Sequence, residues 1–189
     1  MAYFDDLSDY WYTEDGFKPG TLNVGWIKVD EPATFPTLSP SNEFLDKLFQ
    51  FCLIQCVSMR GRHVCELCDD PSTIAERHGR IIRLGSAEIR VFGEAAIYAA
   101  PNLVFHFVSE HHYQPPQEFV DAVMSSVAPP SIDYLSLLKA HQLDFIENTD
   151  LTKACEHTDQ RLIDGWAGMQ AEASELLQRK ALVKSKNIL

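Results

Sequence analysis

Two cysteines and two histidines have the types and the spacing of a metal site. Cys65 and Cys68 form a C-x-x-C pair in MRGRHVCELCDDPS, and His106 and His111 lie further along the chain in HFVSEH. Thiolates and imidazoles are the ligands of tetrahedral zinc, and a C-x-x-C turn can aim both sulfurs at one point. The H-x4-H spacing is typical of histidine pairs at helix ends. The sequence therefore predicts one zinc ion bound by these four residues.

Neighbouring histidines offer alternatives for the same site. His63, two residues before Cys65, could replace one of the helical histidines or support the site from behind, and His112 could replace His111. Positions five apart on a regular helix differ by about 140° around its axis, so His106 and His111 converge only if the last helical turn loosens. The Pro-Pro pair that follows at 115–116 favours such a bend.

Redox use of the cysteine pair is a competing interpretation. A redox-active C-x-x-C pair lies between a strand and a helix with apolar or aromatic neighbours, and its reactive thiol has a lowered pKa. Here the neighbours include Glu66, Asp69 and Asp70, and negative charges raise a thiol pKa. A further alternative is that both cysteines are ordinary loop residues without a metal.

The predicted zinc is structural, because enough protein ligands are present to close its coordination sphere and two thiolates weaken its Lewis acidity. A zinc-dependent hydrolase with Glu88 or Glu110 as base is the alternative, although both carboxylates are equally well explained as solvent-facing residues. The sequence contains no H-E-x-x-H, G-x-S-x-G, P-loop or G-x-G-x-x-G motif. Neither a catalytic residue nor an organic cofactor is therefore assigned.

Several short elements must position the predicted site. A helix is expected from Ser41, with Ser39 or Ser41 as its N-cap and with Phe44, Leu45, Leu48 and Cys52 on one apolar stripe. A short strand is expected at 24–29 within an irregular N-terminal wrap. RIIRLGSAEIRVFGEAAIYAA predicts three strands separated by turns at Gly85 and Gly93. Two helices should follow, the first starting at Pro101 and the second in PQEFVDAVMSS.

These elements predict an α+β fold with a small antiparallel sheet. The order of C-x-x-C turn, β-hairpin and helix is that of a treble-clef zinc site. Residues 1–127 would form this zinc-binding domain, and residues 128–189 a helical extension packed on it. The extension contains SIDYLSLLKAHQ and a longer helix from Asp150, whose apolar stripe could pack on the domain or join two chains as a homodimer; its members are Cys155, Leu162, Trp166, Met169, Ala173 and Leu176.

Composition limits the classes of partner. The chain has 189 residues and is 46% hydrophobic, which is enough to build a core, and its formal net charge of -11 makes nucleic acid an unlikely partner. A local basic cluster is nevertheless present and supports nucleic-acid binding as an alternative: Arg60, Arg62, Arg77, Arg80, Arg83 and Arg90. The preferred interpretation is that these arginines pair with nearby acids, namely Glu66, Asp69, Asp70 and Glu76.

The chain carries no sign of export or membrane insertion. Its first residues, MAYFDDLSDYWYTEDG, are acidic and aromatic where a signal peptide would be basic and then apolar. No apolar run approaches the roughly 18 residues of a membrane span. Five cysteines, an odd number, fit reduced thiols or metal ligands better than a set of disulfides. A soluble, cytoplasmic protein is expected.

Three motifs together resemble a bacterial domain family of unknown function. They are RGRHVCELC, GSAEIRV and YAAPNLVFHFVSEHHYQPPQEFVDAV, and the resemblance covers about residues 24–124. The family pattern is R-G-x-H-x-C-x-x-C, G-x-x-E-I-R-V and Y-A-A-P-x-L-x-x-H-[YF]-V-x-x-H-x-Y-x-P-P-x-x-F. It includes His63, Glu88 and Arg90 beside the four predicted ligands, whereas His112 falls on a variable position. The resemblance implies no activity.

The function expected from these observations is protein binding without catalysis. An acidic module held together by zinc would suit a partner with a basic surface, and a bacterial inhibitor or immunity-type protein is one concrete form.

Overall fold

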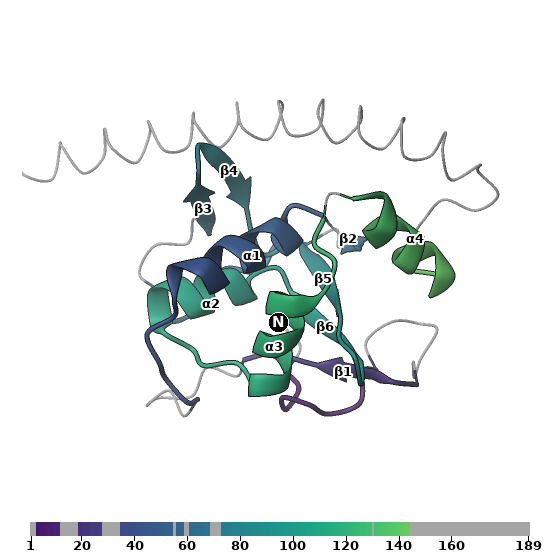
Figure 1. Cartoon of the computed structure of the whole chain (residues 1–189). Helices are drawn as coiled ribbons and strands as arrows, with labels where there is room; N and C mark the ends of the chain where they lie inside the picture. Colours follow the sequence, from purple (N-terminus) through teal and green to yellow (C-terminus); the bar gives the residue numbers. More distant parts are fainter. Residues whose placement is uncertain are drawn as a thin grey trace, which may run out of the picture. The chain divides into compact units, whose positions relative to one another are not determined.

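The computed structural model describes residues 3–11, 19–27, 35–54, 56–58, 61–68, 73–129 and 131–143 (Figure 1). The chain divides into two compact units, each described here by itself. Within the described residues, one unit is the hairpin 74–83 and the other is everything else. The long helix expected from Asp150 lies outside the described residues.

A four-stranded sheet forms the centre of the larger unit. Its order is β1-β6-β5-β2, and its strands are β1 (Thr21–Asn23), β2 (Val57–Ser58), β5 (Ala87–Phe92) and β6 (Ile97–Pro101). Strand β5 pairs antiparallel with β6, as predicted, and also with β2, a strand that was not predicted. Strand β1 pairs parallel with β6, so the sheet is mixed at this edge.

The N-terminal strand lies earlier in the chain than 24–29, where it was predicted. Its register is set by β6, with Thr21 opposite Ile97 and Asn23 opposite Ala99. Gly25 ends the extended run because its φ is +73°, and a Cβ there would meet Cγ2 of Val104 at 2.5 Å. Val24 and Trp26, which follow Asn23, are buried in loop structure rather than in a strand.

Helices cover the central strands (Figure 1). They are α1 (Asn42–Cys52), α2 (Val104–His111), α3 (Gln117–Ser125) and α4 (Ile132–Ala140). Helices α1 and α3 both contact β5, and α1 also contacts α2. The predicted N-cap of α1 is Ser41, whose Oγ accepts a hydrogen bond from the backbone N–H of Phe44 at 3.1 Å. The predicted apolar stripe of α1 is buried.

Helix α2 does not begin at Pro101. Pro101 is the last residue of β6, opposite Glu88, and the next N–H, of Asn102, donates to the carbonyl of Ala87 at 2.8 Å. The sheet ladder thus holds the backbone extended up to this point, and the helix starts at Val104. A proline suits the end of a strand because it has no N–H to donate to a ladder.

Helix α4 packs on the larger unit through one aromatic residue. Ser131 caps the helix by accepting from the N–H of Tyr134 at 3.2 Å. The buried Tyr134 ring lies edge-on to Phe51 and Phe92. The division of the chain after residue 127 stays a prediction.

The second unit is a two-stranded hairpin of β3 (Ile74–Arg77) and β4 (Arg80–Arg83). Its two-residue turn, His78 and Gly79, has φ values of +51° and +72°, as a type I′ turn requires. Strand β4 therefore pairs with the segment before it and not with β5. None of the helices in the described part of the chain has the length and apolar character needed to cross a membrane.

Candidate metal centre

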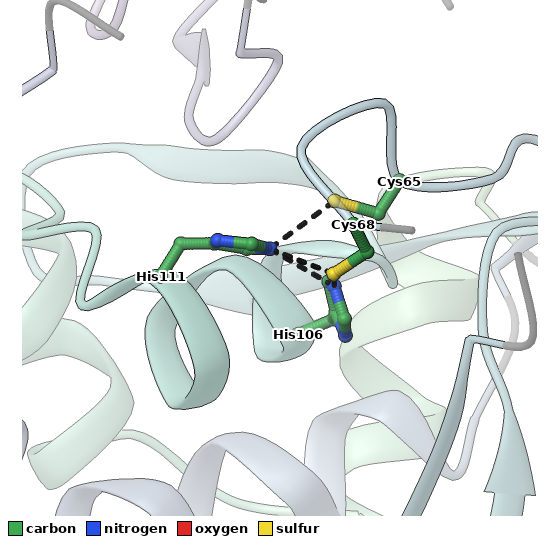
Figure 2. A group of neighbouring side chains, drawn as sticks. All are labelled: Cys65, Cys68, His106 and His111. Carbon is green, nitrogen blue, oxygen red and sulfur yellow. Dashed lines mark hydrogen bonds between the residues drawn. The ribbon is translucent and has the colours of Figure 1, made fainter. Parts of the chain in front are cut away.

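The four predicted ligands converge at one place (Figure 2). His111 Nε2 lies 3.3 Å from Cys65 Sγ, 3.1 Å from Cys68 Sγ and 3.3 Å from His106 Nε2. His106 Nε2 lies 3.2 Å from Cys68 Sγ, and all four atoms lie within 4.8 Å of one another. Zinc bonds of about 2.3 Å to sulfur and 2.1 Å to nitrogen give tetrahedron edges of about 3.4 to 3.8 Å, close to these spacings. The cluster could therefore hold a metal ion.

Two local structures bring these side chains together. The sulfurs come from a turn at Glu66 and Leu67, and the imidazoles come from the first and last turns of α2. The helix ends immediately after His111, where His112 has a left-handed φ of +55° and the N–H of Tyr113 bonds to the carbonyl of Phe107 at 3.0 Å. A residue in the left-handed conformation directly after the last turn is a common way for a helix to end. The helix ends directly after the second imidazole, and the two side chains converge although their positions differ by about 140° around the helix axis.

The surroundings of His111 favour the protonation state that binds a metal. Cys65 is buried, while Cys68, His106 and His111 are partly exposed. Burial lowers the pKa of His111, because the charged imidazolium loses solvation. A neutral imidazole is the form that binds a metal, so this shift reduces the competition from protons.

The two alternative histidines lie outside the cluster. His112 is exposed and occupies the left-handed position that ends α2. His63 supports the cysteine turn through its backbone, since its N–H donates to the carbonyl of Gly85 at 2.7 Å. A left-handed residue or a backbone hydrogen bond of this kind cannot be predicted from residue type. The sequence therefore did not decide whether His63 or His112 is a ligand.

One asparagine links the two halves of the cluster. Asn102, which precedes α2, accepts through Oδ1 from the N–H of Gly85 at 2.7 Å. Gly85 in turn holds His63 at the start of the cysteine turn. The chain from Asn102 through Gly85 to His63 therefore fixes the cysteine turn against the beginning of the histidine helix. Sequence reasoning assigned Gly85 only to a turn and did not single out Asn102.

Gly85 should not tolerate a side chain. Its φ is +93°, and a Cβ there would lie 2.0 Å from the carbonyl oxygen of His63. We expect Gly85→Ala to destabilise the protein by about 2 kcal/mol more than Gly20→Ala, because both variants share the strain of positive φ and only Gly85→Ala adds a backbone clash, and overpacking costs roughly 1–3 kcal/mol. Gly20 is a matched control because its φ is +75° and no atom lies within 4 Å of a Cβ there. Urea unfolding measures both variants, and equal losses would contradict the expected clash.

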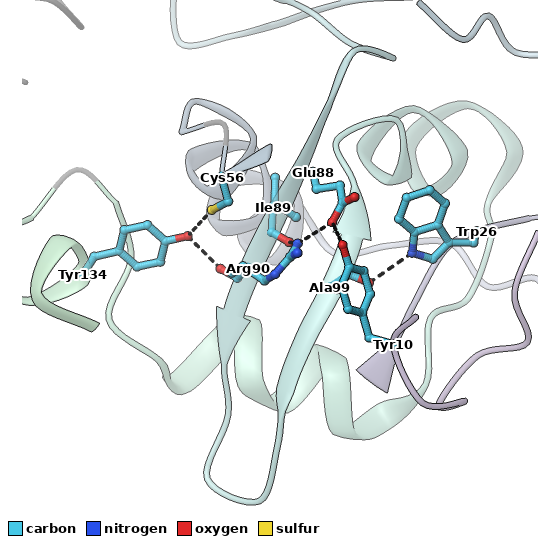
Figure 3. Close-up of polar contacts among 8 residues, drawn as sticks. All are labelled: Tyr10, Trp26, Cys56, Glu88, Ile89, Arg90, Ala99 and Tyr134. Atoms are coloured by element: carbon cyan, nitrogen blue, oxygen red, sulfur yellow. Dashed lines mark hydrogen bonds and ion pairs between the residues drawn. The ribbon is translucent and has the colours of Figure 1, made fainter. Parts of the chain in front are cut away.

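A buried charge pair lies on β5, where the sequence suggested a surface (Figure 3). Glu88 and Arg90 are 0% and 1% exposed, and Glu88 Oε2 lies 2.7 Å from Arg90 Nη1. Tyr10 donates from its hydroxyl to Glu88 Oε2 at 2.8 Å, and its ring centroid lies 4.7 Å from Arg90 Cζ. The solvent-facing interpretation of Glu88 is therefore wrong, and its carboxylate is engaged by Arg90 and Tyr10. Glu110 is an exposed residue of α2.

The other side of Arg90 is closed by α4. The Tyr134 hydroxyl donates to the carbonyl of Arg90 at 2.8 Å, and Cys56 Sγ lies 3.6 Å from the same hydroxyl. Burial raises the pKa of the Cys56 thiol, which keeps it protonated and poorly reactive. The sequence did contain one signal for the charge pair: E-I-R places Glu88 and Arg90 two apart, on the same face of a strand.

Three buried tyrosines should limit stability at high pH. Burial raises the pKa of Tyr10, Tyr113 and Tyr134, whereas an unfolded tyrosine loses its proton near pH 10. Above that pH the unfolded state binds fewer protons, so the free energy of unfolding falls as pH rises, by about 1.4 kcal/mol per unit for each tyrosine. The buried thiols of Cys52 and Cys56, whose pKa values are also raised by burial, start this fall near pH 8.5, so urea midpoints should decline from there and more steeply between pH 10 and 11. Tyr10→Phe should make the fall shallower, and a level curve through pH 11 would contradict this cause.

Not all arginines of the predicted basic cluster can contribute to a basic surface. Arg90 is buried against Glu88, so it is no part of a basic surface. Arg77, Arg80 and Arg83 lie on the β3–β4 hairpin, and Arg62 is exposed beside the cysteine turn. Arg60 and two of the expected acidic partners, Asp69 and Asp70, lie outside the described residues.

The chain was also compared with known proteins. No curated protein and no solved structure matched it. One family matches residues 2–124, which is more than half of the chain and contains all four residues of the cluster. The predicted membership in an uncharacterised family is thereby confirmed, with a match that begins nearer the N-terminus than residue 24. The chain belongs to the family described as Domain of unknown function (DUF7919).

Proposed function

We propose that this protein is a non-catalytic binding module whose fold is held by a structural zinc ion at Cys65, Cys68, His106 and His111. One observation carries the proposal: four protein ligand atoms lie within 4.8 Å of one another, as many as a tetrahedral zinc accepts. A sphere filled by protein has no position for a reacting water. Two thiolates and two imidazoles also suit zinc better than the hard cations that prefer oxygen.

The zinc would connect segments that are distant in sequence. It would tie the cysteine turn to α2, with His63 and Asn102 supporting the turn from behind. The C-x-x-C turn, the β3–β4 hairpin and α2 follow in the order of a treble clef, but β5 and β6 intervene between the hairpin and the helix. The treble-clef interpretation stays a prediction.

A binding role fits the charges better than a hydrolytic one. The net charge of -11 suits a partner with a basic surface, and an inhibitor or immunity-type protein in the cytoplasm is the form we propose. A hydrolase would need an open metal position and a base beside it, and the Glu88 carboxylate is held by Arg90. We also propose that two copies of the chain associate through the C-terminal segment.

Metal content and partner capture test the two parts separately. We expect one zinc per chain by elemental analysis, and a cobalt-substituted protein with the intense visible absorption of a tetrahedral site. A weak spectrum of higher coordination number, with water bound, would overturn the structural assignment. Cross-linked capture from the native host should return a basic protein at low salt and less of it at high salt. Recovery of the chain alone would overturn the binding role.

A further inference from the structure

Residues 3–11, called the strap below, run along the outer edge of β1. The strap is joined to β1 by backbone hydrogen bonds from Leu7 N to Asn23 O at 2.8 Å, from Asn23 N to Ser8 O at 2.8 Å and from Tyr10 N to Thr21 O at 2.9 Å. Asp9 and Leu22 form an isolated antiparallel bridge. The strap therefore covers the edge of the sheet, where an extended segment of another protein could pair in the same way.

Tyr10 attaches the strap to the charge pair on β5. Its side chain is 1% exposed, its hydroxyl donates to Glu88, and its ring lies beside the guanidinium of Arg90. A carboxylate that accepts from a hydroxyl, together with a cation on the ring face, is a recognition site for a phenol. Tyr10 therefore occupies this site as a ligand supplied by the same chain.

The strap is an imperfect ligand. Glu88 Oε1 and Arg90 Nε are both buried without a hydrogen-bond partner, so an acceptor and a donor remain unused beside Tyr10. Leu7 has a φ of +63°, a conformation that a bulky residue adopts only under strain. The unused donor and acceptor and the strained Leu7 reduce the free energy that docking of the strap provides. Two bonds that hold the strap remain, since Asp6 accepts from the hydroxyl of Tyr113 and from the N–H of Gly25.

We propose that the strap is a displaceable self-ligand, and that the Glu88–Arg90 pair receives a tyrosine from an extended segment of a partner protein that replaces the strap on β1. This inference rests on the proposed binding function and names its surface. It does not involve the metal cluster. The partner segment would carry a tyrosine at the position of Tyr10 and would pair with β1 through its backbone.

Hydrogen exchange on the full-length protein tests whether the strap opens by itself. The amides of Leu7, Tyr10 and Asn23 should exchange together and at least about tenfold faster than the paired amides of β5 and β6, because only the strap has to leave. This measurement needs no substitution. Exchange of the strap amides at the rate of β5 and β6 would show that the strap opens only on global unfolding, and the proposal would fail.

A peptide with the sequence of the strap, YFDDLSDYW, tests the site itself. Fluorescence anisotropy of the labelled peptide should show at least about tenfold tighter binding to the Tyr10→Ala protein than to the original chain, whose own Tyr10 competes. A Tyr10→Phe peptide should bind at least about tenfold more weakly than the original peptide, because a hydrogen bond to a charged carboxylate is lost. A Tyr3→Ala peptide is the matched control: Tyr3 is 51% exposed, and its hydroxyl bonds within the strap, to Asp5.

The outcomes separate this inference from the proposed function. Equal binding of the tyrosine and phenylalanine peptides, or no gain in the Tyr10→Ala protein, would overturn the inference. If circular dichroism shows that Tyr10→Ala does not fold, the exchange rates of the unaltered chain decide. If a basic partner is captured and the strap amides stay protected from hydrogen exchange in the complex, the binding function is retained and the strap is rejected as the binding site.

Discussion

Replacing His111 with asparagine should abolish binding of the proposed zinc ion, whereas the same replacement at His112 should leave it in place. His111 Nε2 lies within 3.3 Å of the other three ligand atoms. Without it the cluster has three ligands. His112 is exposed and ends α2 in a left-handed conformation that asparagine also adopts readily. Both variants replace a histidine with an asparagine, but only His111→Asn removes a proposed metal ligand.

The loss of zinc should remove a large part of the free energy of unfolding. A ligand that binds only the folded state stabilises it by about 4 kcal/mol when its free concentration is 1,000 times its Kd. For a chain of this size, that corresponds to a fall of roughly 8–16 °C in Tm. Calorimetry with and without a chelator measures the effect: the chelator should lower the Tm of the original chain and of His112→Asn, and should leave that of His111→Asn unchanged. Full zinc occupancy in His111→Asn would contradict the assigned ligand set.

Breaking the charge pair on β5 should be the second large effect. Arg90→Met leaves the Glu88 carboxylate buried without its cation, and Glu88→Leu leaves the guanidinium of Arg90 without its anion. Because both side chains are at most 1% exposed, water cannot replace the missing partner. Each single variant should lose about 3–5 kcal/mol of unfolding free energy in a urea titration.

The combination should recover much of that loss. With Glu88→Leu and Arg90→Met together, no uncompensated charge remains, and apolar replacements of buried ion pairs are often neutral or stabilising. Tyr10 would still lose the acceptor for its hydroxyl, so adding Tyr10→Phe should bring the stability closest to that of the original chain. Losses that simply add across the double variant would show that the two side chains do not act as a pair.

The sequence predicted the metal cluster well because its signals are local. A C-x-x-C turn and two histidines near a helix end each specify short-range geometry, and all four residues lie together in the structure. The choice between His111 and His112 depended on where the helix stops. That end is fixed by a left-handed residue and by the bond from Tyr113 to Phe107, which residue types alone do not determine.

The misplaced elements depend on distant partners. Strand β1 is set by its parallel register with β6, so the alternation of residues at 24–29 carried no information about it. Pro101 was placed in a helix because its pairing with Glu88 across the sheet is invisible in the sequence. Strand β5 is buried at every position from Ala87 to Val91, so it shows no alternation of inside and outside that would have marked Glu88 and Arg90 as core residues.

The parallel pairing of β1 with β6 also imposes an order on assembly. Strands β5 and β6 are neighbours in the chain and can form a hairpin early, whereas β1 must wait for a strand that is made much later. Tyr10 and Glu88 are separated by 78 positions, so the contact that seals the charge pair closes a still longer loop. During synthesis on the ribosome, Glu88 and Arg90 therefore emerge long after the tyrosine that covers them. We therefore expect closure of this edge to be slower than formation of the β5–β6 hairpin.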